Sequence, residues 1–162
     1  AVFAVWAALA TAGVFPAAEQ QAGIRGGLRR ARVEYLMGMQ SLEQKILDEI
    51  FPAERADAFF DALFGGAEEG AYDIVLVCRE VTPDKAHLAF ELRQRPGRCL
   101  ACNLTYGLPQ VFQRHPILNV ADVVKQVAER LHWQPETTSW KLGHTEELRR
   151  EVHAIPLVLQ RA

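Results

Sequence analysis

Two cysteines separated by two residues form the part of this sequence best suited to chemistry. Cys99 and Cys102 lie in the segment 93–102, RQRPGRCLAC, and Arg114 and His115 follow further along the chain. Because the short spacing keeps both sulfur atoms within reach of one another, such a pair can bind a metal ion or form a disulfide. The arginines would favour the thiolate, the form that both reactions need.

A zinc site is one interpretation of this pair. Structural zinc is held by four Cys or His ligands, and Cys99, Cys102 and His115 match three of them. The next histidine along the chain, His132, lies well beyond the usual gap between the two histidines of a zinc finger. Either of two residues nearer the N-terminus, Cys78 or His87, could supply the fourth ligand only if the fold brings it close.

A redox pair and simple packing are the other two interpretations. In the thioredoxin pattern the two cysteines stand at the start of a helix, but segment 103–109 contains Gly107 and Pro109, which would stop such a helix almost at once. Cysteine also packs well as a small hydrophobic residue in a reduced protein. We therefore expect Cys99 and Cys102 to be reduced and metal-free, with the neighbouring arginines extending into solvent.

Arginines near the two cysteines, together with two tryptophans further along the chain, are suited to binding another protein. Tryptophan and arginine are common at the centres of protein interfaces, whereas burial of the tryptophans against a sheet is the alternative. The candidate interaction residues are Arg95, Arg98, Arg114, Trp133 and Trp140.

Signals for other chemistry are missing from the sequence. The five histidines show neither a His-x3-His nor a His-Glu-x-x-His spacing. The chain also has no phosphate-binding Walker loop, no Gly-x-Gly-x-x-Gly and no Gly-x-Ser-x-Gly. We predict no catalytic and no cofactor-binding residue, and a non-enzymatic protein is the favoured class.

Composition limits the class further. The 162 residues suffice for about one domain with its own core, and 49% hydrophobic with 23% charged residues is typical of globular proteins. The net charge of -2 argues against nucleic-acid binding, which needs a concentrated positive field.

An apolar leader precedes the expected domain. Residues 1–18 carry no charge and are only marginally long enough to span a bilayer, and four arginines follow between positions 25 and 32. A membrane anchor, a signal peptide and a translated stretch upstream of a start near Met37 or Met39 are the three interpretations. We expect residues 1–36 to lie outside the fold and residues 37–162 to form a single cytoplasmic domain, anchored to a membrane only if the leader is a genuine anchor.

Hydrophobic periodicity predicts the elements of that domain. Ser41 and Gln44 have the spacing of a helix capping box, and an apolar stripe predicts a second helix over 51–64. Alternation around a Thr-Pro-Asp-Lys turn predicts an antiparallel hairpin over 72–93, and valines at helical spacing predict a helix over 120–131. The prediction is an α+β fold, with a small antiparallel sheet packed against two or three helices.

The remaining segments give weaker signals. Glycines and prolines over 94–118 predict a long irregular connection with one short strand near 111–112. We expect a short helix over 145–152 and a final strand over 153–159, which Pro156 would place at a sheet edge.

Residues 95–116, RPGRCLACNLTYGLPQVFQRHP, resemble a small uncharacterised family of bacterial proteins that carry the label pancreas/duodenum homeobox protein. The resemblance covers roughly residues 40–131 and implies no catalytic or binding residues. A homeodomain reads DNA through a third helix with an adenine-binding asparagine, and the chain has no Trp-Phe-x-Asn-x-Arg run of that kind. The label's function is therefore not expected here.

These observations leave two classes of function open. The favoured one is a non-enzymatic protein-interaction or regulatory module with an unknown protein partner and no cofactor. The alternative is a Cys-x-x-Cys protein that binds zinc or undergoes thiol redox chemistry.

Overall fold

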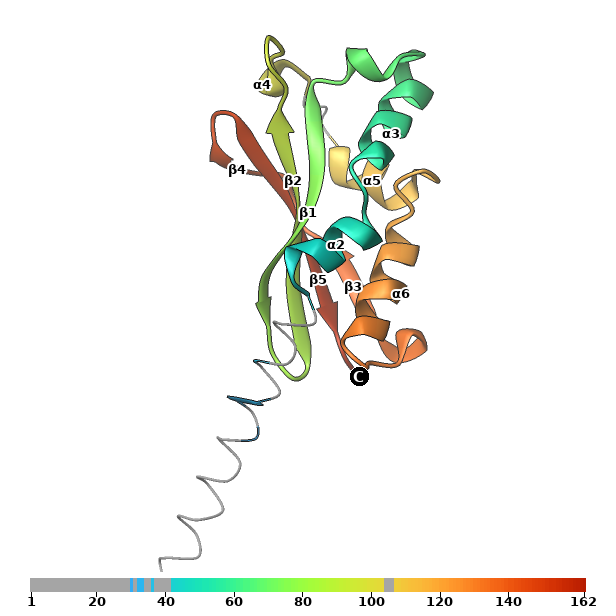
Figure 1. The fold of residues 1–162 in the computed structure, drawn as a ribbon, viewed down its shortest axis with the longest axis vertical. Coiled ribbons are helices and arrows are strands. Elements are labelled where there is room, and N and C mark those ends of the chain that lie inside the picture. The colour runs from blue at the N-terminus through green and yellow to red at the C-terminus, as the bar shows by residue number, and fades with distance from the viewer. Residues whose placement is uncertain (1–29, 31, 34–35, 37–41, 104–106) are drawn as a thin grey trace, which may run out of the picture.

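The computed structural model describes residues 30, 32–33, 36, 42–103 and 107–162. The predictions for the leader and for the capping residue Ser41 fall almost entirely outside these ranges. An antiparallel sheet lies on one side of the described domain and a layer of helices on the other, which confirms the predicted α+β class (Figure 1). The elements are α2 (Gln44–Ile50), α3 (Glu54–Phe64), η1 (Ala67–Glu69), β1 (Tyr72–Val81), β2 (Lys85–Gln94), α4 (Leu100–Asn103), α5 (Leu108–Arg114), α6 (Val120–Arg130), η2 (Pro135–Thr137), β3 (Ser139–Leu142), β4 (Glu146–Arg149) and β5 (Val152–Gln160).

The predicted hairpin is confirmed as β1 and β2. The strands pair in the register that places Leu76 opposite Phe90, and both side chains are buried. The turn is held by Thr82, whose hydroxyl oxygen accepts a hydrogen bond from the Lys85 backbone N–H at 3.0 Å. An irregularity between Cys78 and Glu80 shifts the register near the end of β1.

The final strand is also confirmed, but its predicted place in the sheet is wrong. The strand order is β1-β2-β5-β3, and β4 also pairs with β5, so β5 lies inside the sheet rather than at its edge. Pro156 is tolerated there because its backbone faces the β3–β4 side, where its carbonyl accepts a hydrogen bond from the Gly143 N–H at 2.7 Å. Proline has no N–H to return, so the ladder breaks between β3 and β4.

Two further segments differ from the sequence prediction. Residues 146–149 form strand β4 of a hairpin with β5 and not part of a helix over 145–152. The region around 111–112 is helix α5 and not a strand. Gly107, with a φ of 89°, turns the chain into α5, and Pro109 occupies its first turn, so the residues expected to stop a helix instead begin one.

The core lies between the sheet and the helices. The predicted helix over 51–64 is observed as α3, which begins two residues after Pro52, and the helix over 120–131 is observed as α6. The Asn119 side chain accepts a hydrogen bond from the Asp122 N–H and so caps α6. Within the described residues no helix is long and apolar enough to cross a membrane.

The buried phenol of Tyr72 predicts a loss of stability at alkaline pH. Its ring packs edge-on against Phe60, with centroids 4.9 Å apart, and burial raises the pKa of the Tyr72 phenol. Because this pKa is higher in the folded than in the unfolded chain, the folded state keeps a proton that the unfolded chain releases. The resulting stability is fully present below the unfolded pKa of about 10 and is lost as the pH rises above it.

We therefore expect the free energy of unfolding to fall less steeply above about pH 10 in Tyr72→Phe than in the unmodified protein. Urea denaturation of both proteins at several pH values between about 8 and 11 measures the two slopes. Lysine titration contributes equally to both, so equal slopes would show that Tyr72 is not responsible.

Candidate functional site

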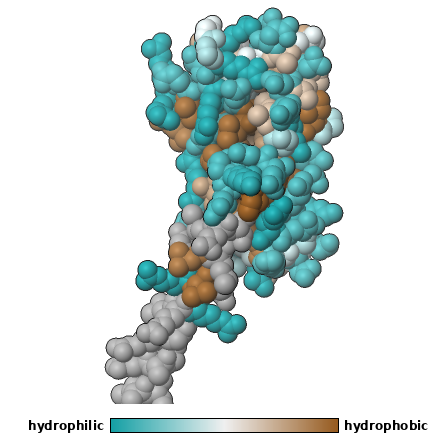
Figure 2. Space-filling model, viewed as in Figure 1, coloured by the Kyte–Doolittle hydropathy of each residue, from teal (hydrophilic) through white to brown (hydrophobic). Residues whose placement is uncertain are grey.

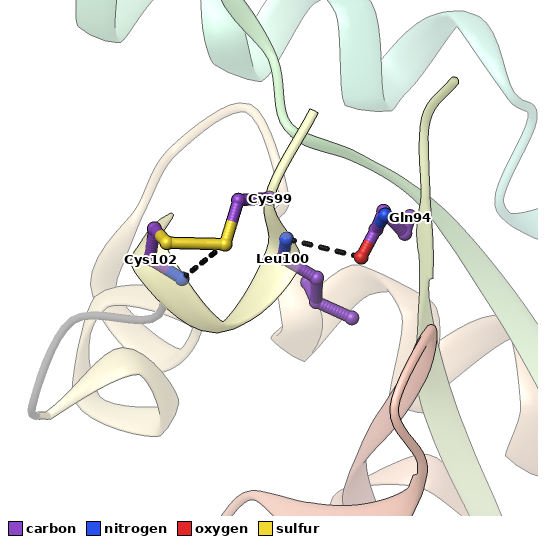
Figure 3. Close-up of a disulfide and its surroundings, with 4 residues drawn as sticks. All are labelled: Gln94, Cys99, Leu100 and Cys102. Carbon is purple, nitrogen blue, oxygen red and sulfur yellow. Dashed lines mark hydrogen bonds between the residues drawn. A yellow bond between two sulfur atoms is a disulfide. The ribbon is translucent and has the colours of Figure 1, made fainter. Parts of the chain in front are cut away.

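The Cys-x-x-Cys segment leaves the end of β2 and carries a disulfide. Cys99 and Cys102 are bonded to each other, with their Cα atoms 5.3 Å apart (Figure 3). The expectation that both thiols are reduced is therefore wrong for this structure. That expectation rested in part on the absence of a long helix after the pair, as the thioredoxin pattern would require. The single turn of α4 is enough to bring the two sulfur atoms together.

The backbone of α4 is held in place by hydrogen bonds on both sides of the disulfide. The Cys102 N–H donates to the Cys99 Sγ atom at 3.2 Å, and the Leu100 N–H donates to the Gln94 side-chain oxygen at 3.3 Å (Figure 3). The Leu100 side chain, which lies between the two cysteines in sequence, is 0% exposed and anchors the segment in the core. Both cysteines themselves are exposed. The hydrogen bonds and the buried Leu100 side chain thus hold the disulfide in place, while both of its cysteines remain exposed to solvent.

The Arg95 side chain does not extend into solvent, contrary to the expectation from the sequence. It supports the fold instead. Its guanidinium donates to Asp73 at 2.7 Å, to Asp57 at 2.5 Å and to the Ala67 backbone carbonyl at 2.8 Å. It also lies over the Phe60 ring, 5.6 Å from the ring centroid, and its side chain is only 19% exposed. Arg95 therefore ties the start of the Cys-x-x-Cys segment to α3, η1 and β1.

The electrostatics of Arg95 follow from this environment. Burial lowers the pKa of the Arg95 guanidinium, but the hydrogen bonds and charges of Asp73 and Asp57 outweigh burial and raise it overall, so the side chain stays cationic. Gly70 provides the space that this arrangement needs: a Cβ atom at this position would lie 2.5 Å from the Phe60 ring and 2.8 Å from an Arg95 nitrogen.

The other candidate interaction residues occupy different environments. Arg98 donates to the Glu68 backbone carbonyl and forms a 3.5 Å ion pair with Glu69, so it too is held by η1. Arg114, at the end of α5, is exposed. Trp133 is 6% exposed and belongs to the core, which corrects its assignment to a partner surface, and Trp140 is partly buried against the same core.

The predicted zinc ligands are not assembled as a metal site. Among the described residues, no group of three or more Cys, His, Asp or Glu side chains could hold a metal ion. His115 packs its ring edge-on against Phe59, with centroids 4.8 Å apart, and its buried Nδ1 atom has no hydrogen-bond partner within the part of the chain that the structure describes. A disulfide provides no thiolate ligand, so zinc binding by Cys99, Cys102 and His115 stays a prediction about the reduced chain.

Cys78 is chemically distinct from the disulfide pair. It is a free, half-buried cysteine that packs against the core, as its place on the apolar face of β1 predicts. Burial raises the pKa of the Cys78 thiol, and a hydrogen bond from the Glu80 backbone offsets this only in part. At neutral pH this thiol is therefore a poor nucleophile, which makes it an internal reference for the reactivity of the other two cysteines.

Sequence reasoning missed the residues that hold the segment in place. Gln94, Asp57 and Asp73 carry no motif, and both aspartates are more than 20 positions from Arg95 in the chain. The one available signal was Leu100, a large apolar residue between two cysteines in a mostly polar stretch.

Comparisons with known proteins provide no family for this chain. No family model matches it, and neither the curated proteins nor the solved structures contain a match. The resemblance of residues 95–116 to the bacterial family stays an expectation.

Proposed function

We propose that this domain is a non-enzymatic regulatory module in which Cys99 and Cys102 alternate between a disulfide and a dithiol. The observation that supports this most is that the two cysteines are bonded to each other while both are exposed. A purely structural disulfide is more often buried and inaccessible to reductants, whereas an exposed one is open to thiol exchange. The output of such a module would be altered binding of a partner protein.

The exchange reaction balances with a dithiol as the reductant. One thiolate of the reductant attacks a sulfur of the pair, the Cys99–Cys102 bond breaks, and its electron pair stays on the other cysteine, which takes up a proton. The second thiol of the reductant then displaces the first cysteine and leaves as part of a disulfide. Oxidation runs in reverse, with a small disulfide as the electron acceptor.

The local geometry favours reactivity at Cys99. In the reduced pair, the Cys102 N–H, which lies 3.2 Å from the Cys99 sulfur, would stabilise a thiolate there. The anchors on either side, Leu100 in the core and Arg98 on η1, would keep the two sulfurs close after reduction. A small change in the segment would then suffice to close the bond again.

Zinc binding by the reduced pair is the second candidate. The observation in its favour is that the buried Nδ1 atom of His115 has no hydrogen-bond partner among the described residues. Against it stands the need for a fourth ligand, which the described residues do not bring to the pair.

Thiol counting under native conditions tests the redox proposal. The protein is equilibrated in glutathione buffers of increasing reducing power, alkylated without denaturant, and weighed by mass spectrometry. We expect two alkylation sites to appear together as the buffer becomes more reducing, at Cys99 and Cys102, while Cys78 reacts slowly throughout.

Single-cysteine variants and a metal measurement are the controls. Cys99→Ser and Cys102→Ser should each abolish the paired transition, whereas Cys78→Ser should leave it unchanged. Failure of the pair to oxidise in excess glutathione disulfide would contradict the redox proposal. Stoichiometric zinc in the reduced protein, lost in Cys99→Ser, would replace it with the metal-binding alternative.

A further inference from the structure

The outer edge of β1 carries backbone groups that do not pair with β2. The Arg95 N–H donates to the Ala71 carbonyl at 2.9 Å, which marks Ala71 as a residue whose backbone faces the neighbouring strand. Backbone direction alternates along a strand, so Tyr72, Ile74 and Leu76 point their N–H and C=O groups away from β2. These residues lie at the edge of the sheet, because β1 is the terminal strand.

One side chain already occupies part of this edge. The Gln44 amide donates to the outward Leu76 carbonyl at 2.9 Å, in the position where the N–H of an added strand would lie. The outward N–H and C=O of Ile74, the next residue along this edge, have no hydrogen-bond partner in the described part of the chain. Edge groups of this kind are open to pairing with another extended chain.

A groove runs along the unpaired edge. Its volume is about 500 Å³, and it is bounded by Ile74 and Val75 on β1 and by Pro52 and Ala53 between α2 and α3. In the space-filling view the surface is largely hydrophilic, and apolar residues are visible beside the teal surface of α2 (Figure 2). The irregularity after Cys78 changes the register of β1. An added strand could therefore pair regularly only with the part of β1 that lies beside the groove.

The charges around the groove leave an excess of carboxylates. Asp48 and Glu54 line it, and the other lining charge, Arg93, already forms a 2.8 Å ion pair with Glu91. Asp48 accepts a hydrogen bond from Gln44 at 2.8 Å, which keeps its carboxylate at the rim of the groove. A basic side chain would complement this site.

We propose that the β1 groove binds an extended segment of a partner protein that carries a lysine or arginine. The segment adds a strand to the sheet by pairing with the outward N–H and C=O of Ile74, and its basic side chain lies against Asp48 and Glu54. This interaction surface goes beyond the redox proposal and does not depend on it, because neither cysteine of the pair lines the groove.

Amide hydrogen exchange of the full chain tests this proposal, with a short acetylated and amidated peptide of alternating valine and lysine as the probe. The free Ile74 amide should exchange quickly, whereas the Val75 amide, which faces β2, should be protected. Peptide at a concentration that occupies about nine tenths of the protein should slow exchange at Ile74 about tenfold and leave Val75 unchanged. No slowing at Ile74 at any soluble peptide concentration would overturn the proposal.

Amino-acid substitutions separate the contribution of the groove's charges to peptide binding from the contribution of its shape. Asp48→Asn combined with Glu54→Gln should weaken peptide binding roughly three- to tenfold, since exposed ion pairs contribute little each. Glu136→Gln, an exposed change on η2 outside the groove, should have no effect. Ala53→Trp should abolish binding by filling the groove. Equal binding of a valine–glutamate peptide would overturn the proposed charge preference.

The same measurement identifies other occupants. Protection of Ile74 in the free protein that rises with protein concentration would replace the partner segment with a second copy of this chain. Protection that disappears on deletion of residues 1–36 would assign the groove to the chain's own N-terminal segment. Either result overturns the proposal.

Discussion

Phe90→Ala is expected to lower the free energy of unfolding by about 3 to 5 kcal/mol, the largest effect of any single change predicted here. Phe90 is 0% exposed, and its ring packs edge-on against Phe51 and Phe112 at centroid distances of 5.2 and 5.6 Å. These contacts join β2 to the α2–α3 connection and to α5. Truncation would therefore remove buried apolar area and leave a cavity between the sheet and two parts of the helical layer.

Leu76→Ala should cost about 2 to 5 kcal/mol for the same reason, because Leu76 lies opposite Phe90 on β1 and is 1% exposed. Urea denaturation of the unmodified protein and both variants measures the loss. Val75→Ala is the matched control: Val75 points to the other face of β1 and is partly exposed, so its truncation should cost much less. Costs below about 1 kcal/mol for both core variants would mean that the face assignment is wrong.

The elements that sequence reasoning identified are those in which local pattern and tertiary burial agree. The spacing of two between Ile74 and Leu76, and between Leu88 and Phe90, places each pair on one face of a strand, and the structure buries that face. Asn119 and the valines after it likewise predict both the start and the buried side of α6. In these segments no distant contact is needed to choose between helix and strand.

Errors arose where a local signal has two meanings. Gly107 and Pro109 are residues that can either end a helix or begin one, and only the position of Leu108 in the core shows which occurs. Pro156 excludes a hydrogen bond on one side of its strand only, so it allows an interior strand wherever the neighbouring strand is broken. Residues 146–149 are exposed along their whole length, so their strand depends on pairing with β5 and not on an apolar pattern.

The sequence indicated that a disulfide between the two cysteines was possible, but it predicted neither that the disulfide forms nor which residues hold the segment in place. The spacing of Cys99 and Cys102 indicates that their sulfurs can meet, and the structure joins them. Sequence alone does not indicate whether positive charge beside the pair is free or neutralised, because the partners of Arg95 come from α3, η1 and β1. Long-range ion pairs of this kind leave no periodic trace in the sequence.

Arg95→Ala is expected to lower the free energy of unfolding by about 1 to 3 kcal/mol. The change removes two ion pairs, leaves the Ala67 carbonyl without this donor and uncovers the Phe60 ring. The expected cost stays moderate because Asp57 and Asp73 are more than half exposed, and solvent screens both pairs. Arg95→Lys keeps the charge but cannot reach three acceptors at once, so it should recover only part of the loss.

Arg98→Ala is the matched control for this network, since the Arg98 side chain bonds to η1 and is 40% exposed; its loss should cost less than about 1 kcal/mol. A double-mutant cycle with Asp57→Asn isolates the Arg95–Asp57 interaction, and the two losses should sum to more than that of the double variant because the partners touch. Simple additivity would show that the 2.5 Å contact between them contributes nothing to stability.

Because Arg95 also fixes the start of the Cys-x-x-Cys segment, Arg95→Ala should speed alkylation of reduced Cys99. Cys78, which lies on β1 outside this segment, should keep its slow rate of alkylation. Unchanged alkylation at Cys99 in a destabilised Arg95→Ala protein would show that the network supports the fold without positioning the redox pair.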